Sequence, residues 1–141
     1  MNFVLDCSFA MAWVLADEGS PETDAVLDSL GKGAKAFVPH LWQWEVGNVL
    51  LGIERKKRAT AATVKGHLLT LQSLPIEVDA AAFDQTWTAT FLLAQKHQLT
   101  AYDAAYLEIA LRRGLPLASL DRELIAAAKI EKVVLMPHSI K

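Results

Sequence analysis

The sequence has few of the residues that mark several classes of protein. A single cysteine, Cys7, among 141 residues excludes an internal disulfide framework and a zinc site built from cysteines. Seven glycines and five prolines, without any low-complexity tract, exclude disordered and fibrous chains. The longest apolar run, residues 9–16, has eight residues, whereas crossing a bilayer takes about 20. These absences favour one cytoplasmic globular domain over residues 1–141, with no membrane segment and no secretion signal.

The net charge and the mean hydropathy indicate which kinds of partner the chain is expected to bind. The chain has 14 basic and 16 acidic residues, and this net charge of −2 argues against a nucleic-acid binder held mainly by bulk charge. The mean hydropathy of +0.23 is high for a soluble domain of this size. We therefore expect a partner to cover some apolar surface, most simply in a homodimer.

Short apolar runs alternate with helical patterns along the chain. The expected strands are residues 3–5, 36–38, 76–78, 117–120 and 133–135. The expected helices are residues 8–16, 21–30, 41–58, 61–74, 80–97, 101–113 and 121–129. This alternation predicts an α/β fold, a three-layer αβα domain with a short, mostly parallel central sheet.

Two acidic residues directly follow expected strands. Asp6 follows the strand at residues 3–5, and Asp121 follows the strand at residues 117–120. Ligands bind at the carboxyl ends of the strands in an open parallel sheet, so both carboxylates are expected on one rim. A lone aspartate at such a position is more often a helix cap, and this alternative stays open for each residue by itself.

Two further acids interrupt apolar helix faces. Asp103 lies in the first turn of a helix that is apolar almost all round and is expected to be buried, whereas Glu108 is expected to reach solvent. Glu45 shares a helix face with Leu41 and Val49. Buried carboxylates that lie together repel one another unless a cation holds them. An all-oxygen donor set favours Mg²⁺ or Mn²⁺ over zinc.

The four acids stand in motifs whose order and spacing resemble those of a PIN domain. The motifs are residues 4–8, 45–50, 102–107 and 120–124, and the acids are separated by 39, 58 and 18 positions. More narrowly, the chain resembles the VapC toxins of bacterial and archaeal toxin–antitoxin pairs. The resemblance implies a Mg²⁺-dependent endoribonuclease that acts on structured RNA such as tRNA or rRNA. It also implies a homodimer that a small cognate antitoxin inhibits.

The resemblance also implies roles for particular residues. The acidic quartet is matched by Asp6, Glu45, Asp103 and Asp121, of which Asp6 and Asp103 are the expected direct metal ligands. Ser8 and Asn48 match polar positions beside the quartet, and Asn48 is expected to orient Glu45. A metal-activated water would attack the RNA and leave a 5′-phosphate and a 3′-hydroxyl.

Basic residues are candidates for holding the RNA backbone. They are Arg55, Lys56, Lys57, Arg58, Arg112, Arg113 and Arg122. A solvated helix end, favoured by the helix dipole, explains the run at residues 55–58 equally well.

Two other functions fit parts of the pattern. In a phosphatase of the haloacid dehalogenase type, Asp6 would be the nucleophile, but Ser8 stands where that group has a second aspartate. In a non-catalytic dimeric binding module, the acids would be helix caps and the apolar surplus would serve docking. The tryptophans fit packing in a core or interface better than base stacking, and the sequence assigns Trp42 and Trp44 no specific role.

Overall fold

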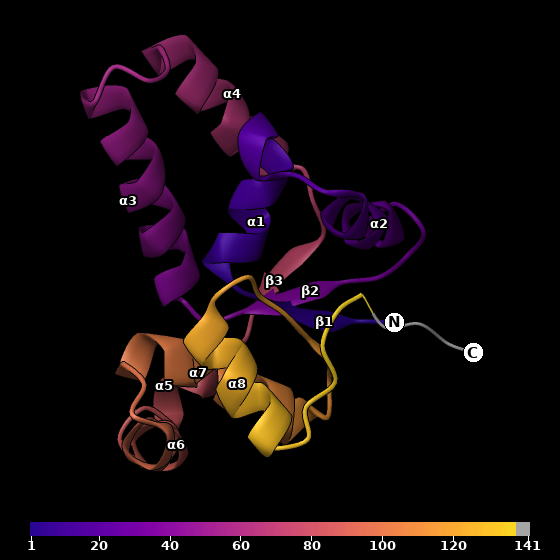
Figure 1. Ribbon diagram of the computed structural model, residues 1–141, viewed down its shortest axis with the longest axis vertical. Helices are drawn as coiled ribbons and strands as arrows, with labels where there is room; N and C mark the ends of the chain where they lie inside the picture. The colour runs from indigo at the N-terminus through magenta and orange to yellow at the C-terminus, as the bar shows by residue number, and fades with distance from the viewer. Residues whose placement is uncertain (138–141) are drawn as a thin grey trace.

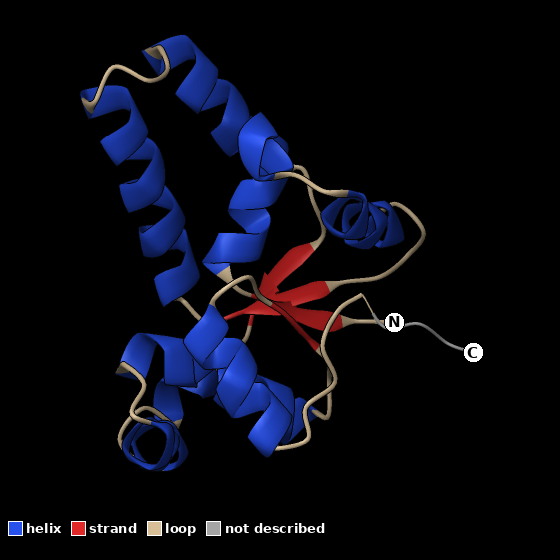
Figure 2. Ribbon diagram, in the orientation of Figure 1, coloured by secondary structure: helices blue, strands red, loops and turns tan. Residues whose placement is uncertain are grey.

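The computed structural model describes residues 1–137 and contains a small parallel sheet between two layers of helices (Figures 1 and 2). The strands are β1 (Phe3–Leu5), β2 (Ala36–Val38), β3 (Ile76–Val78) and β4 (Leu117–Ala118). Their spatial order is β3-β2-β1-β4, and every neighbouring pair is parallel. The runs that form β1, β2 and β4 are buried, as expected for strands covered on both faces.

Helices cover both faces of the sheet. They are α1 (Cys7–Val14), α2 (Pro21–Leu30), α3 (Leu41–Arg55), α4 (Ala61–Gln72), α5 (Ala81–Asp84), α6 (Ala89–His97), α7 (Ala101–Arg113) and α8 (Arg122–Ile130), with a 3-10 turn at Ala16–Glu18. Helices α1–α4 lie on one side of the sheet and α5–α8 on the other, and α3 and α4 form an arm that extends away from the strands (Figure 1). The predicted three-layer α/β fold is confirmed.

Side-chain caps set the beginnings of several helices where the sequence predicts them. Ser20 Oγ accepts a hydrogen bond from the Thr23 amide at 3.1 Å, and Pro21 stands in the first helical turn of α2. Thr100 Oγ1 accepts from the Asp103 amide at 3.1 Å. Gly114 ends α7 with φ +64°, in the left-handed region that favours glycine. Thr100 and Gly114 thereby fix Asp103 in the first turn of α7.

The prediction of one continuous helix over residues 80–97 is wrong, because the structure has two helices there, α5 and α6. The Thr86 hydroxyl donates to the Phe83 carbonyl at 2.8 Å, and Thr88 has the non-helical angles φ −118° and ψ −100°. Hydroxyl side chains that bond nearby backbone compete with the helical ladder, and β-branching adds to this effect. A threonine-rich turn therefore interrupts the helix.

Two predicted strands are shorter in the structure. The strand predicted over residues 117–120 ends at Ala118. Beyond it, the Ser119 hydroxyl donates to the Asp6 carboxylate and the Leu120 amide donates to the Ser8 hydroxyl, so these groups do not continue the strand pairing. The strand predicted over residues 133–135 contributes one bridge, between Leu135 and Leu117.

Within residues 1–137, none of the helices is both long enough and apolar enough to cross a membrane.

Candidate active site

All four predicted acids line one cleft, of about 430 Å³, at the carboxyl edge of the sheet. Asp6 lies between β1 and α1, and Asp121 lies immediately before α8. Asp103 lies in the first turn of α7, and Glu45 lies on α3. The fold thus brings together four carboxylates that are far apart in the sequence, and the exposed side chain of Glu18 lines the same cleft.

Two serines hold one oxygen of Asp6. Ser8 Oγ donates to Asp6 Oδ2 at 2.6 Å, and Ser119 Oγ donates to the same oxygen at 2.8 Å. Each hydroxyl also accepts a backbone N–H at 3.0 Å, Ser8 from Leu120 and Ser119 from Asp121. The buried Asp6 carboxylate is thereby tied to the loop that carries Asp121. Ser119 was not among the predicted site residues, although a serine at the end of an apolar strand, two positions before an acid, was a usable signal.

A tyrosine that was not among the predicted site residues forms a hydrogen bond with Glu45. The hydroxyl of Tyr106 donates a hydrogen bond to Glu45 Oε1, and Tyr106 is completely buried. Tyr106 lies on α7, three positions after Asp103, so one helix carries both a cleft acid and the hydrogen-bond partner of another cleft acid. Asn48, the expected partner of Glu45, is exposed and makes no hydrogen bond to it within residues 1–137.

The environment raises the pKa values of three cleft acids. Burial is the largest cause for Asp6, Glu45 and Asp103. The negative charge of Asp121 adds to the rise at Asp6, and Asp6 does the same at Glu45, while hydrogen bonds from Ser8, Ser119 and Tyr106 oppose these rises. Burial and the charges of the other three acids raise the pKa of Asp103 to about 6. The cleft therefore holds more negative charge than its own groups compensate.

Another acid at the same edge of the sheet has arginine partners and provides an internal comparison. Asp79 follows β3, and its side chain is 0% exposed. Arg112 Nη2 lies 2.9 Å from Asp79 Oδ1, and Arg113 Nε bonds Oδ2. Burial alone would raise the pKa of Asp79, but the two arginines outweigh burial and hold it below its usual value. Arg112 also bonds Glu108 at 2.8 Å, so the expectation that Glu108 reaches solvent is wrong: its charge is neutralised and its side chain is buried.

The four cleft acids lack such partners. Across the part of the chain that the structure describes, none of them forms an ion pair with lysine or arginine. Their oxygen donors have the chemistry that a divalent cation prefers. The cleft acids line its walls without forming a closed cage, since no three Asp, Glu, His or Cys side chains of residues 1–137 surround one metal position. The chemistry of these donors, and not their arrangement in the structure, fits a divalent cation.

A family model for the PIN domain matches residues 3–130. The chain belongs to the PIN domain family. The match confirms the resemblance to PIN domains that the four acidic motifs indicate. No protein of curated function matches the sequence.

Solved structures share the fold of this PIN domain. PAE2754 from Pyrobaculum aerophilum is 28% identical with a TM-score of 0.66, over 90% of this chain and 87% of that one. A toxin–antitoxin complex from Klebsiella pneumoniae gives 17% identity and a TM-score of 0.64, over 98% and 99% of the two chains. The sarcin–ricin loop cleaving toxin VapC20 from Mycobacterium tuberculosis gives 17% and 0.60, over 89% and 94%.

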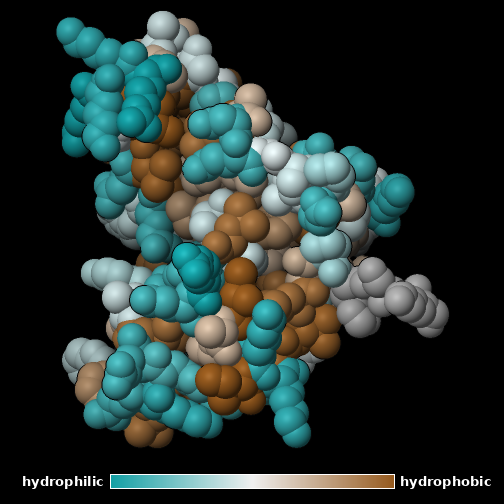
Figure 3. All heavy atoms as spheres, viewed as in Figure 1, coloured by the Kyte–Doolittle hydropathy of each residue, from teal (hydrophilic) through white to brown (hydrophobic). Residues whose placement is uncertain are grey.

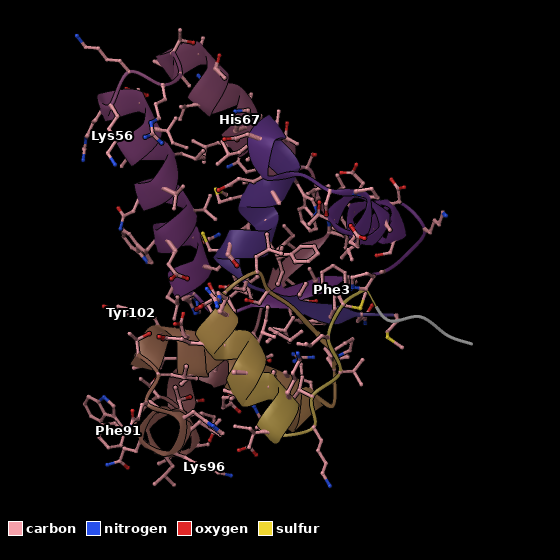
Figure 4. All side chains as sticks on the ribbon, viewed as in Figure 1. Phe3, Lys56, His67, Phe91, Lys96 and Tyr102 are labelled. Carbon is pink, nitrogen blue, oxygen red and sulfur yellow. The ribbon has the colours of Figure 1, made fainter. Side chains whose placement is uncertain are left out.

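The predicted RNA-binding residues lie in three separate places of the PIN domain. Arg55, Lys56, Lys57 and Arg58 lie at the tip of the α3–α4 arm, where Figure 4 labels Lys56, about 15 Å along α3 from Glu45. Arg112 and Arg113 lie at the opposite end of α7 from Asp103, and both form ion pairs with Asp79. The guanidinium carbon of Arg113 also lies 4.0 Å from the centroid of the Phe37 ring. Arg122 is exposed and directly follows Asp121 at the cleft. Of the seven, Arg122 lies nearest in sequence to a cleft acid.

Cys7 lines the cleft of the PIN domain but is not suited to be a nucleophile. Burial is the main cause that raises the pKa of its thiol to about 12, and the charges of Glu45 and Asp6 add to it. The reactive form of cysteine is the thiolate, so Cys7 is unreactive near neutral pH.

Proposed function

We propose that this PIN domain is the toxin of a toxin–antitoxin pair and that it hydrolyses RNA internally with the help of Mg²⁺ or Mn²⁺. The observation that carries the proposal is the contrast between Asp79 and the four predicted acids of the cleft. Asp79 has two arginines, whereas the four predicted acids of the cleft have no cationic partner within residues 1–137. A cation from solution is the simplest source of the missing positive charge.

The cleft residues divide into metal ligands and groups that hold them in place. Asp6 and Asp103 are the proposed direct ligands, and Glu45 and Asp121 complete the site directly or through water. Ser8 and Ser119 orient Asp6, and Tyr106 orients Glu45, by the hydrogen bonds described above. When bound, a divalent ion lowers the pKa of a water molecule and offsets charge on the phosphodiester.

Attack by water predicts products with a 5′-phosphate and a 3′-hydroxyl. The cleft supports this chemistry because its described lining contains no histidine, and its cysteine is held as a thiol. Its carboxylates are suited to holding a cation and to accepting protons from water. A protein nucleophile is not required.

The proposed partners are a small cognate antitoxin, an RNA substrate such as tRNA or rRNA, and a second copy of the chain. The Klebsiella neighbour is described as a toxin–antitoxin complex, and the Mycobacterium neighbour as a toxin that cleaves the sarcin–ricin loop. These descriptions support the antitoxin and the RNA by similarity of fold. A cytoplasmic location stays a prediction, which the free, buried Cys7 suits.

The binding-module alternative requires the acids to be helix caps, and the structure favours that role for one of them. Asp121 accepts a hydrogen bond from the Glu123 amide at 3.1 Å and caps α8. Asp6 makes no cap bond to α1, and the cap of α7 is Thr100 rather than Asp103. Capping therefore does not explain why Asp6 and Asp103 are held in the cleft.

RNA cleavage by the purified protein tests the proposal. Total cellular RNA would be incubated with Mg²⁺, with Mn²⁺ or with EDTA, using wild type, Asp6→Ala and Asp103→Ala. Asp28→Ala is the matched control, because Asp28 is an exposed acid on α2, outside the cleft. We expect discrete fragments from wild type and Asp28→Ala that disappear with EDTA and with either cleft variant. Identical fragments from all four proteins would indicate a contaminating nuclease and contradict the proposal.

A further inference from the structure

One part of the acidic cleft is apolar. Its described lining includes, besides the acids, four hydrophobic side chains from α1 and its C-terminal cap, from α3 and from the loop before α8. They are Met11, Leu15, Val49 and Leu120, and we call them the apolar patch of the cleft. Val49 is 38% exposed and Leu120 is 45% exposed, so both are open to a bound molecule. In Figure 3, hydrophobic atoms (brown) lie beside hydrophilic ones (teal) in the region between α1, α3 and the start of α8.

Leu120 is held in a fixed position relative to the acids. Its backbone N–H donates to Ser8 Oγ at 3.0 Å, and the same hydroxyl donates to Asp6 Oδ2 at 2.6 Å. Both chain neighbours of Leu120 also belong to the site, because Ser119 bonds Asp6 and Asp121 lines the cleft. An exposed leucine by itself needs no explanation. A leucine that is anchored beside a proposed metal ligand, however, is positioned to contact the molecule that binds there.

The charges of the cleft determine which part of an RNA can lie against the apolar patch. The described lining holds the carboxylates of the four predicted acids and of Glu18, and it holds no lysine, arginine or histidine. Carboxylates repel phosphate groups except where a cation lies between them. The nucleobase is the uncharged part of a nucleotide, and its flat face can pack against side chains. When a phosphate lies at the proposed metal, the adjoining base is therefore the part that fits the apolar patch.

We propose that the apolar patch is a subsite for the nucleobase next to the scissile phosphate and that Leu120 contacts this base. The inference rests on the proposed nuclease function and deepens it. Stacked neighbours cover the faces of a base inside a duplex, so the subsite takes a base in a loop, a bulge or a single strand. The cleft volume of about 430 Å³ lies within the range of pockets that hold small molecules.

If Leu120 contacts the base, truncating the leucine and removing the base should have the same effect. The wild type would first be used to map a cleavage position in cellular RNA. A short RNA with that position would then be compared with two versions that carry an abasic ribose on the 5′ or the 3′ side of the scissile phosphate. We expect one abasic RNA to be cleaved with a kcat/KM about 10-fold below that of the intact RNA. Leu120→Ala should lower kcat/KM about 10-fold on the intact RNA and should not lower it further on that abasic RNA.

Three further variants separate contact with the base from general effects. Leu120→Met keeps an apolar side chain of similar volume and should restore most of the kcat/KM that Leu120→Ala loses. Val49→Ala shortens the apolar patch from α3 and should repeat the pattern of Leu120→Ala. Leu69→Ala is the matched control, because Leu69 is 57% exposed on α4, outside the cleft, and it should behave like wild type on every RNA. Affinity for Mn²⁺, measured by calorimetry, should be the same in all variants, because the acids and their hydrogen bonds are kept.

Three results would overturn the subsite. The first is a Leu120→Ala variant that cleaves the intact RNA as fast as wild type. The second is an equal loss in this variant on the intact RNA and on both abasic RNAs, which would mean that Leu120 acts on the acids and not on the base. The third is a wild type that cleaves both abasic RNAs as fast as the intact one. Metal-dependent cleavage by the wild type would in each case leave the nuclease function standing, whereas a wild type that cleaves no RNA would reject the function and the subsite together.

Discussion

Replacing Asp103 with asparagine should stabilise the metal-free protein and remove its response to metal. The pKa of Asp103 is raised from 3.8 to about 6, chiefly by burial and then by the charges of Asp121, Asp6 and Glu45. The folded protein therefore binds this proton more tightly than the unfolded chain does. In the wild type, this group lowers stability as the pH rises from about 4 to about 6, and the loss persists at neutral pH. Asparagine has no charge, so the variant avoids the loss.

The magnitude follows from the pKa shift and the exposure of the side chain. The rise to about 6 corresponds to about 3 kcal/mol for a fully buried group, but Asp103 is half-buried, and solvent screening reduces the expected gain to about 1 kcal/mol. Metal acts in the opposite direction. A divalent ion at 100 times its dissociation constant stabilises the wild type by about 2.7 kcal/mol, and the variant should gain little.

Urea unfolding followed by circular dichroism measures both effects, in EDTA and in Mg²⁺, at about pH 4 and about pH 7. Asp79→Asn is the matched control, because it makes the same chemical change at a buried acid that has cationic partners. It should lose about 2 kcal/mol, since Arg113 would lose its carboxylate partner and Arg112 would keep only Glu108. The reasoning is refuted if Asp103→Asn is less stable than wild type in EDTA at neutral pH, or if Mg²⁺ stabilises both proteins equally.

Three other substitutions separate the roles of individual residues. Tyr106→Phe releases Glu45 and should lower metal affinity about 10-fold, measured by calorimetry with Mn²⁺, and an unchanged affinity would remove Tyr106 from the site. Ser119→Ala removes a hydrogen bond that lowers the pKa of Asp6, so the acidic limb of the pH–activity profile should move to higher pH, and an unmoved limb would contradict this. Arg113→Met should cost about 2 kcal/mol in urea unfolding, because Asp79 loses one of its two arginine partners. RNA affinity should not change, because Arg113 is paired with Asp79, and weaker RNA binding by the folded variant would contradict this.

Local signals predicted much of the fold because the features concerned depend on neighbours in sequence. The apolar runs of β1 and β2, the Ser20–Pro21 start of α2 and the Gly114 end of α7 lie where propensity and capping chemistry place them. The same reasoning placed Asp6 at the end of a strand. Since parallel strands end at one edge, an acid after one strand and an acid after another could be assigned to the same cleft.

Partners across the sheet could not be predicted in this way. The resemblance made Asn48, on the same helix, the expected partner of Glu45, but Tyr106 takes that place from another helix, 61 positions away. Glu108 was expected in solvent because helical periodicity rotates it away from Asp103, but the packing of α7 buries it beside Arg112. Both errors arise because a pattern along one helix does not describe the elements that pack against it.

The sequence by itself determined the order of strands and helices, the three-layer class and the four acids, since each follows from local propensity and from the geometry of parallel strands. Tertiary structure alone decided which acids have cationic partners. Asp79 and Asp103 are both acids beside apolar segments, yet Asp79 meets two arginines and Asp103 meets three other carboxylates. The free energy of a buried charge depends on the charges within a few ångströms of it, and only the packed chain brings those charges together.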